Sequence, residues 1–360
     1  MIQEKKPVVV HYFTYPDRIG GPLTYIHTLM DSELNRHYDQ KTCFQNKAPH
    51  GVNLPLLREM TATLRQMKPH IVHIHGVQSE GFYGVLAARL AGCRHIVMTA
   101  HGFVHDAAYC NRIKRFLYQY IIEPLALRWS DRVYCVCDFA ARREIITRNT
   151  GKNNWGYIHN CVPTMHTTCT REQMRRELGL GAQEQVFAIS GRVTREKGFD
   201  ILEETVRRIE DENFRLLVIG DGNYRQTFEE NMVPQIRSGR VVMVGQTDRV
   251  ADYLAASDGF IFPTYHENLS IALLEACASG LACVVSNVGG NPEVITDGVN
   301  GAVVAGFDPA DYARRVTELL RDPERMKLYQ QEAKRTAQQR FSKEKMIREV
   351  QKVYDSFSPR

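Results

Sequence analysis

Two carboxylates stand eight residues apart in the stretch "YHENLSIALLEACASG", with Glu267 before an apolar helical run and Glu275 inside it. That spacing is too wide for two acids that share one proton, but it suits two ends of one extended ligand. We therefore expect Glu267 and Glu275 to hold different parts of the same molecule. The alternative for Glu275 is an ordinary carboxylate on the surface of a helix.

The same stretch predicts the start of a helix at the ligand. The strand "GFIFPT" precedes the loop, and the pattern predicts a helix over 269–279 that ends at Gly280, a typical left-handed cap. The first N–H groups of a helix have no partner within it, so they bind phosphate well. The residues whose main chain would do so are Asn268, Leu269 and Ser270.

A cationic pair follows another strand, in "SGRVTREKGFDIL". Arg192 is predicted at the end of the strand, and Lys197 with Gly198 at the start of the next helix. A planar guanidinium and a compact ammonium at such a junction suit a diphosphate, although a solvated basic loop is the alternative. Gly222 in "VIGDG" and Gly245 in "RVVMVG" end two further strands, but such turns are common and the pattern is not GxGxxG.

The first half of the chain has its own candidates at strand ends. Gly20 and Gly21 follow the first predicted strand and permit close approach of the backbone to a ligand. His101 follows the strand "HIVMTA", where a lone histidine is either structural or catalytic.

The histidines of the first half also raise the alternative of a zinc site. His101 and His105 have helical spacing, and His73 and His75 are available as further ligands. A strand that runs into Gly102 argues against the helix that this site needs. The chain has no DxD pair, and we expect no metal.

Short apolar runs rich in Val and Ile alternate with longer helical patterns. Their apolarity is continuous, which is typical of strands buried on both faces of a parallel sheet. The expected strands are "PVVVHYF", "HIVHIHG", "HIVMTAHG", "RVYCVC", "VFAISGR", "RLLVIGDG", "RVVMVG", "GFIFPT" and "ACVVSN". The fold class is therefore α/β with doubly wound parallel sheets, whose ligands bind beyond the carboxyl ends of the strands.

The alternation of predicted strands and helices is interrupted by the polar stretch 149–174. This interruption predicts two domains with a boundary near 162–170. The stretch "EKMIREVQKVYDSF" predicts a terminal amphipathic helix. Its apolar residues on one side are Met346, Ile347, Val350, Val353 and Tyr354.

Composition suits a globular cytoplasmic protein. Nine scattered cysteines, an odd number, favour reduced thiols over a disulfide framework, and we find no signal peptide or membrane-spanning segment. Residues 1–165 contain 20 Lys and Arg against 12 Asp and Glu, within a net charge of +5 for the whole chain. This excess favours a membrane surface or a phosphate-bearing substrate as partner, or simply aids solubility. We expect no nucleic acid partner.

Together these residues resemble the retaining glycosyltransferases of family four, of the bacterial polysaccharide and lipopolysaccharide type. The resemblance runs from the loop at Gly20 through "AHG" and "GRVTREKG" to the two glutamates and "VGGNPEVI". It implies the GT-B fold, in which two Rossmann-like domains face each other across a cleft. The acceptor would bind to 1–163 and the nucleotide sugar to 164–340, and the terminal helix over 341–360 would cross back to the first domain.

The resemblance also implies roles for the polar residues. Arg192 and Lys197 would bind the donor diphosphate, Glu267 the hydroxyls of the donor sugar, and Glu275 the ribose. The amides of 268–270 would contact sugar and phosphate.

In the first half, the resemblance implies that His101 lies near the reacting carbon and that Gly21 lies by the diphosphate. Gly289 and Gly290 would let the chain turn closely beneath the site. Two departures stand out: Asn268 and Leu269 replace the usual Gly-Phe, which bears on donor identity, and Cys161 replaces an interdomain glycine, which bears on the hinge.

The implied reaction is a metal-independent, retaining transfer of a hexosyl unit from a nucleoside diphosphate sugar. UDP is favoured and GDP-mannose is the alternative, and no cofactor is expected. The acceptor would be a glycan or lipid-linked glycan of cell-surface polysaccharide biosynthesis. A nucleotide-sugar epimerase of the same fold and a zinc-dependent hydrolase are the alternative functions.

A helix predicted over 111–129 combines cations with large apolar residues and is interrupted by Pro124. This pattern fits a helix that lies at a membrane interface, and it also fits a helix that packs on the core with one wet face. The first interpretation predicts peripheral contact with an anionic membrane at the inner face of the cytoplasmic membrane.

Overall fold

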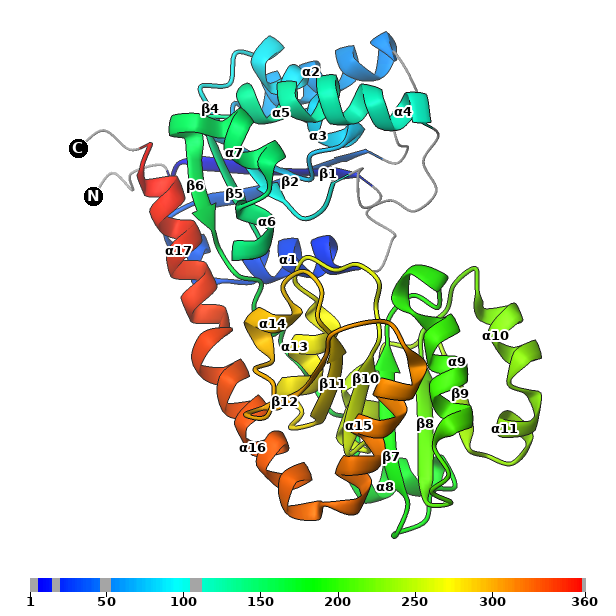
Figure 1. The fold of residues 1–360 in the computed structure, drawn as a ribbon. Coiled ribbons are helices and arrows are strands. Elements are labelled where there is room, and N and C mark those ends of the chain that lie inside the picture. The colour runs from blue at the N-terminus through cyan, green and yellow to red at the C-terminus, as the bar shows by residue number, and fades with distance from the viewer. Residues whose placement is uncertain (1–5, 15–19, 46–52, 104–111, 358–360) are drawn as a thin grey trace. The chain divides into compact units, whose positions relative to one another are not determined.

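The computed structural model describes residues 6–14, 20–45, 53–103 and 112–357. The chain divides into two compact units (Figure 1). The first unit contains Met1–Asn160 and Lys343–Arg360, and the second contains Cys161–Ser342. The terminal helix is therefore part of the first unit, although 182 residues of the second unit precede it in the sequence.

The first unit is built on a parallel six-stranded sheet in the order β2-β1-β3-β4-β5-β6. Its strands are β1 (Val8–Thr14), β2 (Asp39–Gln45), β3 (Ile71–His75), β4 (His95–Ala100), β5 (Arg132–Cys135) and β6 (Asn154–Tyr157). Its described helices are α1 (Gly21–Met30), α2 (Leu54–Met67), α3 (Ser79–Leu90), α4 (Arg112–Leu117), α5 (Glu123–Arg128), α6 (Asp138–Ala141), α7 (Glu144–Thr150) and α17 (Lys343–Asp355), with short helical turns η1 (Glu33–Arg36), η3 (Tyr118–Ile122) and η4 (Gly151–Asn153).

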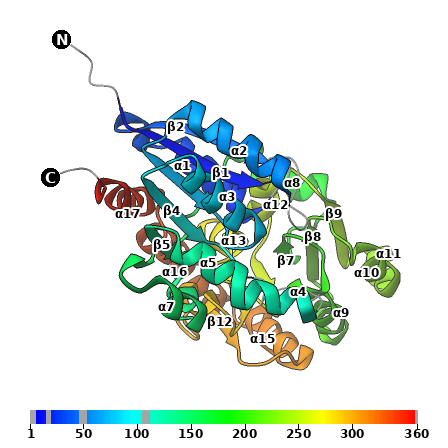
Figure 2. The ribbon, with the colours of Figure 1, turned by 90° about the horizontal axis from the view of Figure 1, so that it is seen from above.

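Helices cover both faces of this sheet. Helices α2, α3 and α5 pack side by side on one face (Figure 2). Helices α1 and α17 contribute Tyr25 and Tyr354 to the other face, where they contact side chains of the strands. As predicted, α17 buries Met346, Ile347 and Val350 with its other apolar residues.

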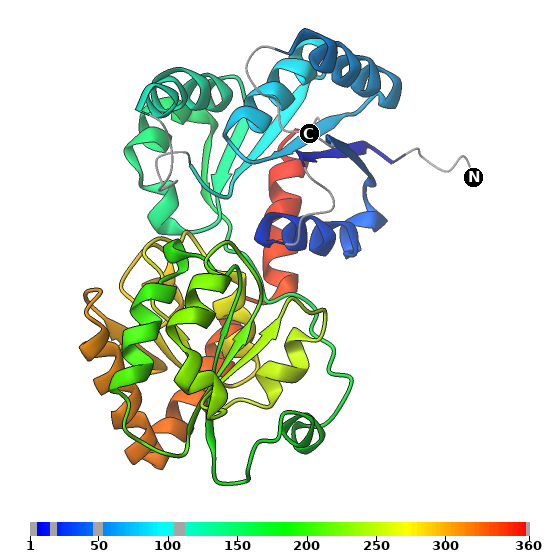
Figure 3. The ribbon, with the colours of Figure 1, turned by 90° about the vertical axis from the view of Figure 1, so that its right-hand side faces the viewer.

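The second unit contains another parallel six-stranded sheet, in the order β12-β11-β10-β7-β8-β9. Its strands are β7 (Gln185–Ser190), β8 (Phe214–Ile219), β9 (Val241–Gly245), β10 (Gly259–Phe262), β11 (Ala282–Ser286) and β12 (Gly301–Val304). Its helices are α8 (Arg171–Glu177), α9 (Phe199–Arg208), α10 (Arg225–Asn231), α11 (Val233–Arg237), α12 (Val250–Ala255), α13 (Ile271–Ala278), α14 (Asn291–Val294), α15 (Pro309–Arg321) and α16 (Pro323–Arg340), with the turn η5 (Arg195–Lys197). Helices α9 (green) and α15 (orange) pack against each other (Figure 3).

The fold class predicted from the sequence is confirmed, because both sheets are parallel and all nine predicted strands form. The strands β3, β10 and β11 are buried along their whole length, which explains their continuous apolar sequences. The sequence missed β2, β6 and β12, which all lie at sheet edges. The first two are largely polar, and the third has only four residues, so none gives the signal of a central strand.

The helix predicted over 111–129 is divided into three parts. Helix α4 passes into the π-helical turn η3, and Pro124 lies in the first turn of α5. A proline lacks the N–H group that a continuous α-helix needs there, so the change of helix type at this point has a local cause. Within the described residues, no helix is both long and apolar enough to cross a membrane.

Candidate active site

The candidate site of the second unit lies where the topology of its sheet reverses. Strands β7 and β10 are neighbours, but the chain continues from β7 to β8 on one side and from β10 to β11 on the other. The connections therefore diverge at the carboxyl ends of β7 and β10, and such a point accommodates ligands in doubly wound folds. Arg192 and Lys197 follow β7, and Glu267 follows β10.

The loops after β7 and β10 bring Lys197 to Glu267. The φ of Gly198 is +76°, and a Cβ atom there would lie 2.0 Å from the carbonyl oxygen of Pro263, so only glycine permits this approach. The N–H of Tyr265 donates to the carbonyl oxygen of Glu196 across the same contact, at 3.0 Å. As a result, Nζ of Lys197 lies 2.5 Å from Oε2 of Glu267.

The ion pair between Lys197 and Glu267 is mostly shielded from water, with side chains 17% and 16% exposed. Arg192 differs, because its side chain is exposed. Within the described part of the chain it makes no hydrogen bond or ion pair, so its guanidinium is available to a ligand. The strand β7 ends at Ser190, two residues earlier than predicted, so Arg192 stands in the loop.

The glycines of two further strand ends hold the neighbouring loops together. A Cβ atom at Gly222 would lie 2.3 Å from the carbonyl oxygen of Val193. The carbonyl oxygen of Gly245 accepts a hydrogen bond from the N–H of Gly220 at 2.8 Å. These contacts explain the glycines by packing between the ends of β7, β8 and β9, and a role in donor binding stays a prediction.

The helix after Glu267 begins later than predicted. Ser270 is the N-cap of α13, and its Oγ accepts a hydrogen bond from the N–H of Leu273, so the helix covers 271–278 rather than 269–279. Asn268, Leu269 and Ser270 are buried in the turn before it. Gly280 has a φ of +75°, as predicted for a residue just past the helix end.

The glycine pair after β11 lies directly against this turn. A Cβ atom at Gly289 would lie 1.6 Å from the carbonyl oxygen of Glu267, and one at Gly290 would lie 2.2 Å from that of Asn268. The N–H of Gly290 also donates to the carbonyl oxygen of Asn268. The close turn predicted for Gly289 and Gly290 is therefore present.

Glu275 is a carboxyl group in an unusual environment. It lies on α13 and is partly buried, and within the described residues its side chain has no hydrogen bond or ion pair. Burial raises the pKa of this carboxyl to about 7. A buried carboxyl without a partner is costly, and hydroxyl donors of a ligand would satisfy it.

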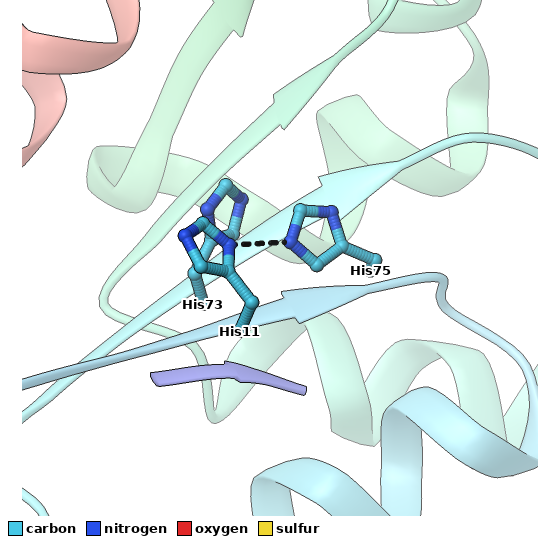
Figure 4. A group of neighbouring side chains, drawn as sticks. All are labelled: His11, His73 and His75. Carbon is cyan, nitrogen blue, oxygen red and sulfur yellow. Dashed lines mark hydrogen bonds between the residues drawn. The ribbon is translucent and has the colours of Figure 1, made fainter. Parts of the chain in front are cut away.

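The first unit holds His101 at the carboxyl end of β4, beside a group of buried histidines. Its Nε2 lies 3.5 Å from Nδ1 of His75, and the ring of Tyr25 meets it edge-on. His11, His73 and His75 form a buried cluster in which one ring nitrogen of each residue lies within 4.8 Å of the others (Figure 4). Burial lowers the pKa of His11 to about 4 and that of His101 to about 3.

The sequence named only some members of this cluster. It grouped His73, His75 and His101 with His105, which lies outside the described residues, and it missed His11. The register of the sheet sets His11 opposite His73, and parallel pairing of β1 with β3 is the signal that would have found it. Gly21 is the first residue of α1. None of the described residues would contact a Cβ atom at Gly20.

Two family models match the chain, one in each half. Residues 34–161 match the family described as "Glycosyl transferase 4-like domain", and residues 170–336 match "Glycosyl transferases group 1". The chain carries these two glycosyltransferase domains. Both family models support glycosyltransferase activity, and the epimerase alternative has no support from the family models or from the relatives.

This glycosyltransferase is similar to enzymes of several organisms. It is 26% identical over 271 residues to UDP-Gal:alpha-D-GlcNAc-diphosphoundecaprenol alpha-1,3-galactosyltransferase of Escherichia coli, covering 70% of this chain and 68% of that one. Its structure resembles sucrose-phosphate synthase from Thermosynechococcus elongatus, with a TM-score of 0.83, 18% identity and coverage of 98% and 99%. It also resembles HepE from Anabaena in complex with UDP and glucose, with a TM-score of 0.81, 16% identity and coverage of 97% and 99%. These likenesses show the GT-B fold.

Proposed function

We propose that this glycosyltransferase transfers a hexosyl unit from a UDP-sugar to a hydroxyl group of a lipid-linked glycan, with retention at the anomeric carbon and without a metal ion. The observation that carries the proposal is the group of charged residues at the reversal point of the second sheet. There the exposed guanidinium of Arg192, the shielded ion pair, and a carboxyl that has no partner among the described residues follow two adjacent strands. A nucleoside diphosphate sugar has three parts that these three groups can bind: a diphosphate, a sugar and a ribose.

Each group has a part of the donor for which its chemistry is suited. Arg192 and Lys197 bind the diphosphate, and the turn before α13 adds its amides. Glu275 accepts hydrogen bonds from the ribose hydroxyls, and Glu267 accepts them from hydroxyls of the sugar. UDP is supported by the structural neighbour from Anabaena, which was solved with UDP and with UDP-glucose.

The reaction needs charge stabilisation more than an enzyme nucleophile. The bond between the anomeric carbon and the phosphate oxygen breaks, and its electron pair leaves with the diphosphate. Arg192 and Lys197 stabilise the negative charge that develops there. The acceptor oxygen forms its bond on the same face of the sugar, and its proton passes to the departing phosphate oxygen. Retention follows from this geometry, and positioning supplies much of the catalysis.

The lipid-linked acceptor is supported by the first unit. Its segment 113–121 exposes large apolar side chains, with Ile113 at 78%, Phe116 at 60% and Tyr120 at 60%. These side chains are therefore not packed in the core. Cationic Arg112 lies beside it in a unit with a basic excess, which suits an anionic membrane surface. The name of the Escherichia coli relative also includes a diphosphoundecaprenol acceptor.

The membrane part of the proposal has a direct test. Wild-type protein should sediment with vesicles of anionic phospholipid at low salt, and Phe116→Ser with Tyr120→Ser should reduce the bound fraction severalfold. Leu328→Ser is the matched control, because Leu328 is 48% exposed on α16 of the second unit. Failure of wild-type protein to bind would refute membrane contact while leaving the donor assignment intact.

The donor proposal is tested by release of nucleoside diphosphate from a panel of UDP-, GDP- and ADP-sugars, with and without EDTA. We expect slow hydrolysis of one UDP-sugar without acceptor, unchanged by EDTA, and faster release with extracted lipid-linked glycan. Release that requires a divalent ion would refute the metal-independent mechanism. Preference for a GDP- or ADP-sugar would refute the donor assignment.

A further inference from the structure

The histidines of the first unit form part of a polar layer on one face of its sheet. In the register of the strands, His11 lies opposite His73, and His75 lies opposite Thr99. Neighbouring parallel residues point to the same face, so these side chains meet inside the protein. All four are buried, in a place where doubly wound folds normally have apolar side chains.

Two branches of hydrogen bonds run through this layer within the described residues. One branch connects Gln40, His11, His75 and His101 in sequence, through contacts of 2.9, 3.0 and 3.5 Å. The other is centred on His73, whose ring nitrogens contact the hydroxyls of Tyr354, Thr99 and Tyr134. The first branch ends at His101, a candidate catalytic residue, whereas the second continues from Tyr134 to the hydroxyl of Tyr25.

The direction of the first branch is fixed at its far end by a main-chain carbonyl. Nε2 of Gln40 donates to the carbonyl oxygen of Leu29 at 3.0 Å and to Oδ1 of Asn35 at 2.8 Å. A carbonyl oxygen can only accept, so the amide nitrogen of Gln40 faces Leu29 and its Oε1 faces His11. His11 must therefore donate through Nε2 to Gln40.

The hydrogen bond from His11 to Gln40 fixes which nitrogen donates in each of the three rings, His11, His75 and His101. Burial lowers the pKa values of His11, His75 and His101, so each ring is neutral and carries one N–H. With Nε2 of His11 protonated, its Nδ1 accepts from Nε2 of His75. Nδ1 of His75 then accepts from Nε2 of His101. Every ring in the branch is the Nε2–H tautomer.

The geometry argues against a metal ion within the cluster. The ring centres of His11 and His75 are 5.3 Å apart and their facing nitrogens are 3.0 Å apart. The difference between these two distances equals about two ring radii, so both nitrogens lie on the line between the ring centres. They therefore point directly at each other, along a hydrogen bond (Figure 4). A metal ion needs ligand atoms that converge on a third point about 2 Å from each. Both nitrogens of His73 also have hydroxyl partners.

We propose that His75 is a positioning residue which, with His11 and Gln40 behind it, holds His101 in the Nε2–H tautomer and fixes the orientation of its ring. The catalytic importance of this tautomer rests on the proposed function, together with the family resemblance, which implies that His101 lies near the reacting carbon. The tautomer itself follows from the hydrogen bonds and is independent of that function. Partners that orient a metal-ligating histidine contribute roughly ten- to hundredfold to metal affinity or activity, and we expect an effect of the same order for the partners of His101.

The test is a two-bond proton–nitrogen correlation spectrum of protein labelled with ¹⁵N-histidine, in which each ring reports its protonated nitrogen. We expect wild-type His101 as Nε2–H, and a change to Nδ1–H or to a tautomer mixture in His75→Phe and in Gln40→Leu. Gln40 is only partly buried, so the second variant remains informative if His75→Phe does not fold. The control is Thr99→Val, which breaks a contact of His73 and should leave the His101 signals in place.

The functional part of the test measures the rate of sugar transfer from the donor. We expect His75→Phe to transfer about ten- to hundredfold more slowly than wild type, His75→Gln to recover part of that loss, and Thr99→Val to remain within about twofold. The proposed control of the His101 tautomer by the first branch is overturned by Nδ1–H at wild-type His101, or by an unchanged tautomer in both His75→Phe and Gln40→Leu. Stoichiometric zinc in the purified protein would also overturn it. A changed tautomer with full transfer overturns the positioning role. Absence of turnover in wild type, with the expected tautomer, refutes the proposed function and supports the control of the His101 tautomer by the first branch.

Discussion

In the second unit the polar residues of the candidate site stand on loops beyond the strands, whereas in the first unit the buried histidine layer stands on the strands themselves. Arg192, Lys197 and Glu267 follow β7 and β10, and the sheet beneath them is apolar. His11, His73 and His75 lie within β1 and β3 and are fully covered. The first arrangement leaves charged groups accessible to a ligand, and the second gives neutral rings that only other protein groups can reach.

This difference separates two ways in which polar side chains serve an enzyme. Residues on loops tolerate charge because water or a ligand solvates them. Residues inside a sheet must satisfy every donor and acceptor within the protein, so a change in one alters its neighbours. Substitutions in the second unit should therefore change activity more than stability, and those in the buried layer should change stability as well.

The largest expected effect is on transfer by Lys197→Ala. Removal of a cation that stabilises the leaving group should slow transfer about 10²- to 10³-fold, with a melting temperature within a few degrees of wild type. Initial rates with the identified donor and differential scanning calorimetry measure the two quantities. The matched control is Arg195→Ala two residues away, whose side chain is 66% exposed and pairs with Asp200. Equal losses in both variants would show that general loop charge, rather than Lys197, is what matters.

An intermediate effect is expected on the stability of the first unit in Tyr354→Phe. The Tyr354 hydroxyl lies 2.7 Å from Nδ1 of His73, so its loss leaves a buried nitrogen without its partner. The free energy of unfolding should fall by about 1–2 kcal/mol in urea denaturation. In Tyr12→Phe the hydroxyl removed contacts the Met60 sulfur, a weak acceptor, at 3.8 Å, and the loss should be under about 0.5 kcal/mol. A loss in Tyr12→Phe as large as in Tyr354→Phe would contradict a special role for the polar layer.

The smallest effect is the pH dependence of donor affinity through Glu275. The pKa of this carboxyl in the free protein is about 7, and ribose hydroxyls that donate to it favour its ionised form. Donor binding therefore releases a proton below pH 7, and affinity should rise about tenfold between pH 6 and pH 8. Titration calorimetry with a UDP-sugar measures this, because its diphosphate does not titrate in that range. Glu275→Gln should bind more weakly with a flat profile, and a wild-type slope retained in Glu275→Gln would assign the titration to another group.

The sequence predicted the second unit better than the first for a physical reason. Lys197 and Glu267 are charged residues next to buried apolar strands, so their types and positions alone suggest a ligand. Gly289 and Gly290 lie in a motif whose tight turn the backbone contacts require. The contact between Lys197 and Glu267 itself was not predictable, because it depends on how Gly198 lets one loop rest on Pro263.

The polar layer of the first unit has no comparable local signature. His11 stands in the apolar run "PVVVHYF" and lies 62 residues before His73 in the sequence. Only the parallel register of β1 with β3 places the two rings together. Tyr354 comes from a helix that was predicted to be amphipathic, but nothing in its pattern shows that its hydroxyl meets a histidine. Long-range pairing of this kind is visible only in the folded chain.

The position of α17 in the sequence has a consequence for how the protein is made. During synthesis the first 160 residues are complete long before Tyr354 is added, because the whole second unit is translated in between. At roughly 5–20 residues per second, the nascent first unit waits for its last helix for about ten seconds or more. Throughout that interval His73 lacks its tyrosine partner. The unit whose synthesis begins first is thus the last to be completed.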